Sequence, residues 1–267
     1  MYGNYSGAMD QSMFFNPDAP QEICPSIWLG PYTSLSQNNF LVNKNVKIII
    51  NCLTTDKFLQ ALDEPQVTIS SDVIILSLDP SFSADCESKP LVDQFIKQFN
   101  RILQNYLQYF YVNNPNSGNL IHQIPNNQLL SSITSPILQG NLKLQFFNLI
   151  RLINLFKCIN SDMQILVVSE TGNANLSTGL IIAYLMDCYN YNLPNSFSLI
   201  QSSRPSVSPL NNNYYDDLLI IENLKKFMVE NNSLKKKTPG EDEIPMEEDM
   251  DYNEICVGGD RKRRFRS

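Results

Sequence analysis

A polar segment between two apolar runs carries the residues that could do chemistry in this chain. Residues 165–168 read Ile-Leu-Val-Val, and a second apolar run begins at residue 180. The segment between them contains, in order, Ser169, Glu170, Thr171, Gly172, Asn173, Ala174, Asn175, Leu176 and Ser177. A strand that passes through such a loop into a helix presents backbone N–H groups and the positive end of the helix dipole to an anion. The chemistry that this arrangement supports is phosphate binding.

The strand, loop and helix resemble the phosphate-binding loop of the dual-specificity protein phosphatases. The family pattern is His-Cys-x-x-x-x-x-Arg-Ser, followed by an apolar helix that often reads Ile-Ala-Tyr-Leu-Met, and residues 182–186 keep this helix sequence. In the family the cysteine supplies a thiolate nucleophile, and the arginine six residues later clamps two phosphate oxygens in a bidentate fork. The resemblance implies descent from such a phosphatase.

Counting back from the retained helix without a gap gives one registration of the loop. It places Ser169 at the histidine, Glu170 at the cysteine, Leu176 at the arginine and Ser177 at the following serine. We favour this ungapped registration because it retains the serine. In it, both the nucleophile and the clamp are replaced.

A second registration slides the loop by one residue. It places Ser169 at the cysteine, Gly172 at the loop glycine and Asn175 at the arginine, and it needs one extra residue before the helix. This registration also lacks the cysteine and the arginine. Both registrations therefore predict that the chain has no catalytic residue and does not carry out cysteine-dependent phosphate hydrolysis.

No other cysteine can begin the family pattern. The cysteines are Cys24, Cys52, Cys86, Cys158, Cys188 and Cys256, and none has an arginine six residues later. The single histidine is His122, and no Cys-x-x-Cys pair occurs. We therefore expect no metal site and no cofactor. The simplest interpretation is reduced, buried thiols in a cytoplasmic or nuclear protein, or one found in both.

The resemblance also gives Asp79 and Glu170 possible roles. Asp79 stands where the family carries its general acid, in Leu78-Asp79-Pro80 after a predicted strand. The alternative is an aspartate that opens a turn, which we favour because an acid has nothing to complete without a nucleophile. For Glu170 we hypothesise that its carboxylate fills the amide cradle as a substitute anion.

The elements around the loop predict an α/β fold. Apolar and β-branched runs predict strands at residues 46–53, 73–78 and 163–168. Residues 23–30 resemble the first strand of the dual-specificity phosphatases, which implies a strand there too. Helices are predicted at residues 31–40, 91–111, 142–159, 177–189, 194–203 and 211–229. Before the last helix, Arg204-Pro205 begins a turn that is similar to the family's Arg-Pro-x-x-x-Pro. We expect a central, mostly parallel sheet flanked by helices, as in dual-specificity phosphatases.

Composition along the chain predicts three regions. Residues 1–20 are a flexible N-terminal segment, residues 21–230 are the phosphatase-like domain, and residues 231–267 are a disordered charged tail. The domain carries an inserted excursion around residues 106–141, of which residues 113–141 are rich in Asn, Ser and Pro. Long loops in compact domains are often functional, so partner binding is one role for this excursion.

Composition and charge narrow the classes of partner. The formal net charge of −7 argues against nucleic acid as the partner. No apolar run approaches the roughly 20 residues that span a bilayer, so we do not expect a membrane protein. The leading hypothesis is a pseudophosphatase that binds a protein partner, either a phosphoprotein, a kinase or a phosphatase. The alternatives are a phosphopeptide-binding module that uses the altered loop, and an active phosphatase by descent. The sequence does not specify an oligomeric state.

Overall fold

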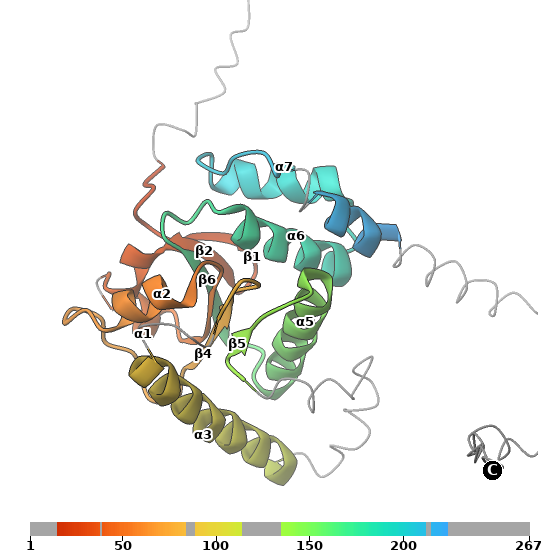
Figure 1. Ribbon diagram of the computed structural model, residues 1–267. Coiled ribbons are helices and arrows are strands. Elements are labelled where there is room, and N and C mark those ends of the chain that lie inside the picture. The colour runs from red at the N-terminus through yellow and green to blue at the C-terminus, as the bar shows by residue number, and fades with distance from the viewer. Residues whose placement is uncertain (1–14, 38, 84–88, 114–134, 212–214, 224–267) are drawn as a thin grey trace, which may run out of the picture. The chain divides into compact units, whose positions relative to one another are not determined.

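A computed structural model describes residues 15–37, 39–83, 89–113, 135–211 and 215–223 (Figure 1). The chain divides into two compact units, residues 1–227 and 228–267, and all described residues belong to the first. Three predicted features therefore lie outside the described residues. They are the charged tail at residues 231–267, residues 114–134 of the excursion, and residues 1–14 of the N-terminal segment.

A six-stranded sheet forms the centre of the fold. Its strands are β1 (Gln21–Cys24), β2 (Ile27–Pro31), β3 (Val46–Asn51), β4 (Ile74–Leu78), β5 (Ile137–Leu138) and β6 (Gln164–Ser169). They lie in the order β1-β2-β6-β3-β4-β5, with β1 antiparallel to β2 and all other neighbours parallel. The predicted central, mostly parallel sheet is confirmed. Because β6 lies between β2 and β3, the loop after it opens at the middle of the edge where the parallel strands end.

Helices cover both faces of this sheet, as predicted (Figure 1). They are the 3-10 helix η2 (Tyr32–Leu35), α1 (Phe40–Asn43), α2 (Thr55–Leu62), α3 (Lys89–Asn113), α5 (Leu142–Ile159), α6 (Asn175–Tyr189) and α7 (Leu193–Ser203), and residues 215–223 are also helical. One apolar cluster joins α5, α6 and α7 to the sheet, and the other joins η2, α1 and α2 to its opposite face. α3 contributes to both clusters.

The central strands follow from their uninterrupted apolar sequences. Ile48, Ile49 and Ile50 of β3 are completely buried, and they alternate between the two apolar clusters. A strand buried on both faces needs apolar residues at every position, because successive side chains point to opposite faces. The same alternation occurs in β6, where Val167 packs into one cluster and Val168 into the other. These two strands fix the position of the loop.

Several elements differ from the sequence prediction. The single strand expected at residues 23–30 is a hairpin of β1 and β2, whose turn holds Ser26 at a φ of 71°. The helix expected at residues 31–40 is η2 followed by the short α1. α2 and the two-residue β5 were not predicted, because both are too short to show a clear period. No helix in the described ranges has the length and apolar character needed to cross a membrane.

The N-terminal segment predicted to be flexible at residues 1–20 is partly built into the fold. The backbone carbonyls of Pro17 and Ala19 accept hydrogen bonds from the buried Arg204 guanidinium. Residues 15–20 therefore differ from the prediction. Composition alone suggested a polar lead-in, whereas the contacts that order these residues come from a side chain 185 positions away.

Candidate functional site

The candidate site is the loop between β6 and α6. Gly172 lies in it with a φ of 68°, and its N–H donates a hydrogen bond to the Ser169 carbonyl at 3.2 Å. A Cβ atom at this position would lie 2.6 Å from the carbonyl carbon of Gly30 and 2.6 Å from an Arg204 nitrogen. The loop therefore needs glycine both for its left-handed backbone and for the close approach of β2.

Ser169 is the residue whose side chain faces the inside of the loop. It is completely buried, and its Oγ accepts a hydrogen bond from the Ala174 N–H at 3.4 Å. The same Oγ lies 3.5 Å from the Oγ of Ser177 on α6. In the family the nucleophile must face the amides that cradle the phosphate. Ser169 is thus the loop residue whose side chain faces the start of α6.

The start of α6 agrees with the shifted registration. Leu176 is 8% exposed and packs into the apolar core, so it presents no group to the loop. Asn175, six residues after Ser169, is half-buried at the first position of the helix. The geometry reverses the preference for the ungapped registration. That preference rested on Ser177 and the retained helix sequence, which do not report the direction of the loop side chains.

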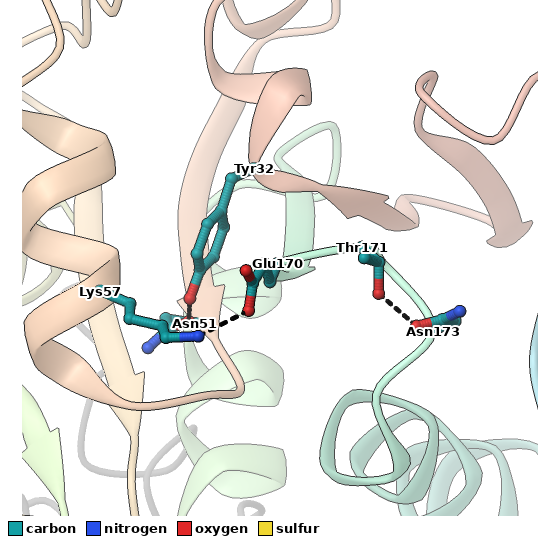
Figure 2. Close-up of polar contacts among 6 residues, drawn as sticks. All are labelled: Tyr32, Asn51, Lys57, Glu170, Thr171 and Asn173. Carbon is teal, nitrogen blue, oxygen red and sulfur yellow. Dashed lines mark hydrogen bonds and ion pairs between the residues drawn. The ribbon is translucent and has the colours of Figure 1, made fainter.

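Glu170 points away from the cradle. Its carboxylate accepts a hydrogen bond from Lys57 Nζ of α2 at 2.9 Å, and both side chains are 57% exposed (Figure 2). The hypothesis that Glu170 fills the amide cradle is therefore wrong. The physical reason is alternation at the end of a strand: when Ser169 points inward, the next side chain points to the other side.

Replacement of Lys57 by alanine should change the free energy of unfolding by no more than about 1 kcal/mol, because exposed ion pairs contribute little. Urea denaturation of the wild-type and variant chains measures the difference. A loss well above that value would show that the Lys57–Glu170 pair holds α2 against the loop.

The remaining loop residues leave backbone N–H groups available. The Thr171 hydroxyl donates to the Asn173 carboxamide oxygen (Figure 2). The Asn173 side-chain amide donates to the Ser206 carbonyl at 3.5 Å. Among the described residues, no protein acceptor receives the backbone N–H groups of Thr171, Asn173 or Asn175. Unbonded amides are expected at a helix N-terminus. These N–H groups are donors that the loop leaves available to a ligand.

A buried polar network supports the neighbouring strand ends. The Tyr32 hydroxyl donates to Asn51 Oδ1 at 2.8 Å (Figure 2). The Asn51 amide donates to Ser77 Oγ at 2.9 Å. Ser77 Oγ lies 2.9 Å from Thr55 Oγ1. Burial raises the pKa of Tyr32, and the nearby Cys52, Glu170 and Asp79 raise it further. Tyr32 is thus a neutral hydrogen-bond donor at the C-terminal edge of the sheet.

Asp79 has a structural role at the start of α2. It is 5% exposed, and its Oδ2 accepts hydrogen bonds from the backbone N–H of Thr55 at 2.8 Å and the Thr55 hydroxyl at 3.0 Å. Its Oδ1 accepts from the backbone N–H of Ser81 at 3.2 Å and the Ser81 hydroxyl at 3.0 Å. Both oxygens are occupied, so the geometry agrees with a turn-opening aspartate and not with a general acid aimed at the loop.

Replacement of Asp79 by alanine should lower the free energy of unfolding by about 2 kcal/mol, because four buried or half-buried donors lose their acceptor. Asp79→Asn, which keeps one side-chain oxygen, should cost less. Chemical denaturation of both variants tests this. An alanine variant as stable as the wild type would show that water or another group replaces the carboxylate.

The buried Arg204 contacts the loop, and the sequence did not single out its side chain. Its side chain is completely buried, and it donates to the carbonyls of Thr171 and Gly172 at 2.9 and 2.6 Å. Burial lowers its pKa to about 10, while the charge of Asp18 acts in the opposite direction. The side chain therefore stays cationic at neutral pH. Its signal in the sequence was the Arg204-Pro205 turn, which was matched without a role for the side chain.

The described cysteines do not replace the missing nucleophile. Cys24 and Cys52 are buried, and burial raises the pKa of Cys24 to about 12 and that of Cys52 further still. A thiol that is rarely ionised is a poor nucleophile. Cys188 is half-buried, with its sulfur 3.5 Å from Asn154 Oδ1. In the described part of the chain, no group of three or more His, Cys, Asp or Glu side chains could hold a metal ion.

Comparison with known proteins gives one family match and a set of similar structures. The model of the family described as the YAL037W N-terminal domain matches residues 18–172. No curated protein sequence matches the chain. Similar solved structures include a leucine-rich repeat and phosphatase domain containing protein from Entamoeba histolytica, at 17% identity and a TM-score of 0.41, covering 79% of this chain and 96% of that one.

Two further structures are mammalian. The human tyrosine phosphatase-like serine/threonine/tyrosine-interacting protein is 16% identical with a TM-score of 0.40, and the match covers 78% of this chain and 98% of that one. A mouse putative dual specificity phosphatase, solved with zinc tungstate, is 13% identical with a TM-score of 0.43, covering 80% and 92% of the two chains. The proteins that the fold resembles are thus phosphatases or phosphatase-like proteins.

Proposed function

The chain belongs to the YAL037W N-terminal domain family, and we propose that it is a pseudophosphatase that binds a protein partner in phosphorylation signalling without hydrolysing phosphate. The observation that carries the proposal is the side chain inside the loop. The Ser169 hydroxyl faces the start of α6 and accepts a hydrogen bond from the Ala174 N–H. The resemblance to dual-specificity phosphatases, in the shifted registration, puts a thiolate at this position.

The surroundings of Ser169 do not activate it. A serine nucleophile needs a base within hydrogen-bond reach. The Oγ of Ser169 contacts the Ala174 N–H, which is a donor, and the hydroxyl of Ser177, which is not a base at neutral pH. Asp79, the candidate acid, has both oxygens occupied by other groups. These contacts support a loop without catalytic chemistry.

The loop also lacks the phosphate clamp. Arg204 lies nearby, but its guanidinium donates to backbone carbonyls of the loop instead of pointing into it. Asn175, at the position of the family arginine in the shifted registration, cannot form a charged fork. The Glu170 carboxylate at the rim opposes a phosphate dianion, and Lys57 offsets that charge. The expected ligand is therefore a protein surface, with a phosphoprotein, a kinase or a phosphatase as the candidate partner classes.

Reversing the charges at the rim tests whether this face binds the partner. The double variant Lys57→Glu, Glu170→Lys keeps an ion pair but exchanges its poles. The matched control Lys47→Asp, Asp72→Lys does the same at an ion pair between β3 and the turn before β4. In affinity capture from cells, we expect proteins bound by the wild type to be lost with the first variant and kept with the control. Equal retention by both would contradict binding at the loop.

A second function, phosphopeptide binding, is favoured by the unbonded N–H groups of Thr171, Asn173 and Asn175. Capture from lysate treated beforehand with a broad phosphatase separates the two. The scaffold proposal predicts that bound proteins are retained after treatment. Their loss would replace it with phosphate-dependent recognition by the remaining cradle.

A further inference from the structure

One side chain connects the N-terminal strap, which we define as residues 15–20, to the loop. On the loop side, Arg204 Nε donates to the Gly172 carbonyl at 2.6 Å, and Nη2 donates to the Thr171 carbonyl at 2.9 Å. On the strap side, Nη2 donates to the Pro17 carbonyl at 2.7 Å and Nη1 to the Ala19 carbonyl at 3.1 Å. The same planar group therefore holds both segments.

Two more contacts complete the strap side. Arg204 Nη1 also donates to the side-chain oxygen of Gln21, the first residue of β1. The ring of Phe15 lies 5.5 Å from the guanidinium carbon, a geometry that suits a cation–π contact. The donors of a guanidinium have fixed directions in one plane. A movement of the group that follows the strap therefore also changes its hydrogen bonds to the loop.

Close contacts with the backbone of β2 also connect the strap to the loop. A Cβ on Gly30 of β2 would lie 3.0 Å from the Cβ of Pro20 in the strap. A Cβ on Gly172 would lie 2.6 Å from the backbone carbon of Gly30. Strap, β2 and loop are thus stacked with no room for a side chain between them.

The direction of the loop amides follows from these contacts. In a planar trans peptide, the carbonyl of one residue and the N–H of the next point in opposite directions. Because the Gly172 carbonyl points to Arg204, the N–H of Asn173 points away from Arg204. That N–H is one of the groups with no protein acceptor among the described residues. The guanidinium therefore sets the orientation of an amide available to a ligand.

From these contacts we propose that the N-terminal strap and Arg204 are positioning elements of the loop, so that the conformation of residues 169–175 depends on the strap. This goes beyond the proposed function, and it does not require a partner. It assigns residues 15–20, which lie about 150 positions before the loop, to the site. A ligand that displaced the strap would change the loop without touching it.

Amide hydrogen exchange, resolved by NMR, tests the proposal in the whole chain and in two deletions. The loop reporters are the N–H groups of Gly172, Ala174 and Thr178, which donate to Ser169 and Ala174. The distant controls are the N–H groups of Val73 and Asn160, which donate to Ser70 and Phe156. We expect deletion of residues 1–20 to speed exchange of the reporters at least tenfold, with the controls changed less than twofold. Deletion of residues 1–14, which leaves the strap, should change neither.

Point variants keep the test decisive if the longer deletion does not fold. Gln21→Ala should speed reporter exchange about threefold, because it removes one acceptor from Arg204. Arg204→Lys keeps the charge but loses the planar fork of donors, so it should speed reporter exchange as much as the longer deletion does. When the two changes are combined, the exchange rate should rise less than twofold above that of the deletion alone. Unchanged reporters, or equal acceleration of reporters and controls, would overturn the proposal. Because no partner enters the measurement, its result is independent of the proposed function.

Discussion

Replacing Arg204 with methionine will lower the free energy of unfolding by about 3 to 5 kcal/mol, more than any other single change considered for this chain. The guanidinium is completely buried and donates to four backbone carbonyls and one side-chain oxygen. Methionine fills similar volume but leaves these acceptors without a donor. Buried acceptors that have lost a charged donor carry the full cost of their desolvation. Urea denaturation followed by circular dichroism measures the change.

Arg151→Met provides the matched control. Arg151 on α5 lies 3.7 Å from Asp187 on α6, and its side chain is 16% exposed. This pair is longer than the Arg204 contacts and is partly exposed, so its loss should cost less, about 1 kcal/mol. A similar cost for both variants would mean that the effect at Arg204 comes from the loss of any arginine on these helices. A cost below 1 kcal/mol at Arg204 would mean that water replaces its hydrogen bonds.

Introducing the cysteine and arginine of the dual-specificity phosphatases, at the positions given by the shifted registration, should create phosphatase activity. The variant Ser169→Cys, Asn175→Arg places a thiol inside the loop at a helix N-terminus, which lowers a thiol pKa, and adds a guanidinium six residues later. We expect it to hydrolyse para-nitrophenyl phosphate at least about a hundredfold faster than the wild type. This substrate is suitable because its leaving group needs little help from an acid, and Asp79 is occupied.

The variant Glu170→Cys, Leu176→Arg makes the same change in the ungapped registration and serves as the control. Its thiol would replace an exposed side chain, and its arginine would enter the apolar core. We expect no gain of activity and a marked loss of stability. Activity in this variant, with none in the other, would restore the ungapped registration. Thiol alkylation against pH separates the two cysteines further, because only Cys at position 169 should show a pKa below the ordinary value of about 8.5.

The sheet was predictable because its central strands are buried in apolar surroundings on both faces. Ile48 to Ile50 and residues 165–168 need apolar side chains at every position, because both of their faces are buried. The hairpin at Ser26 was not predictable in the same way. It depends on a left-handed residue that is not glycine, and it interrupts an otherwise continuous apolar pattern.

The composition of the site was predictable, whereas its orientation was not. The absence of cysteine and arginine follows from the sequence in either registration. Which of Ser169 and Glu170 faces the cradle depends on how β6 is registered against β2 and β3, and single-residue slips reverse the faces. The role of Arg204 was not predictable, because it depends on contacts of one guanidinium with both the strap and the loop, and these segments are about 150 residues apart in the sequence.

Hydrolysis of para-nitrophenyl phosphate by the purified wild-type chain tests the central claim most directly. The chain should be assayed beside Ser169→Ala and Glu170→Ala, with the folding of each checked by circular dichroism. The absence of a nucleophile and of a clamp predicts that the wild type shows no turnover above either variant. Turnover by the wild type that Ser169→Ala or Glu170→Ala abolishes would contradict the claim that this phosphatase-like domain has lost its chemistry.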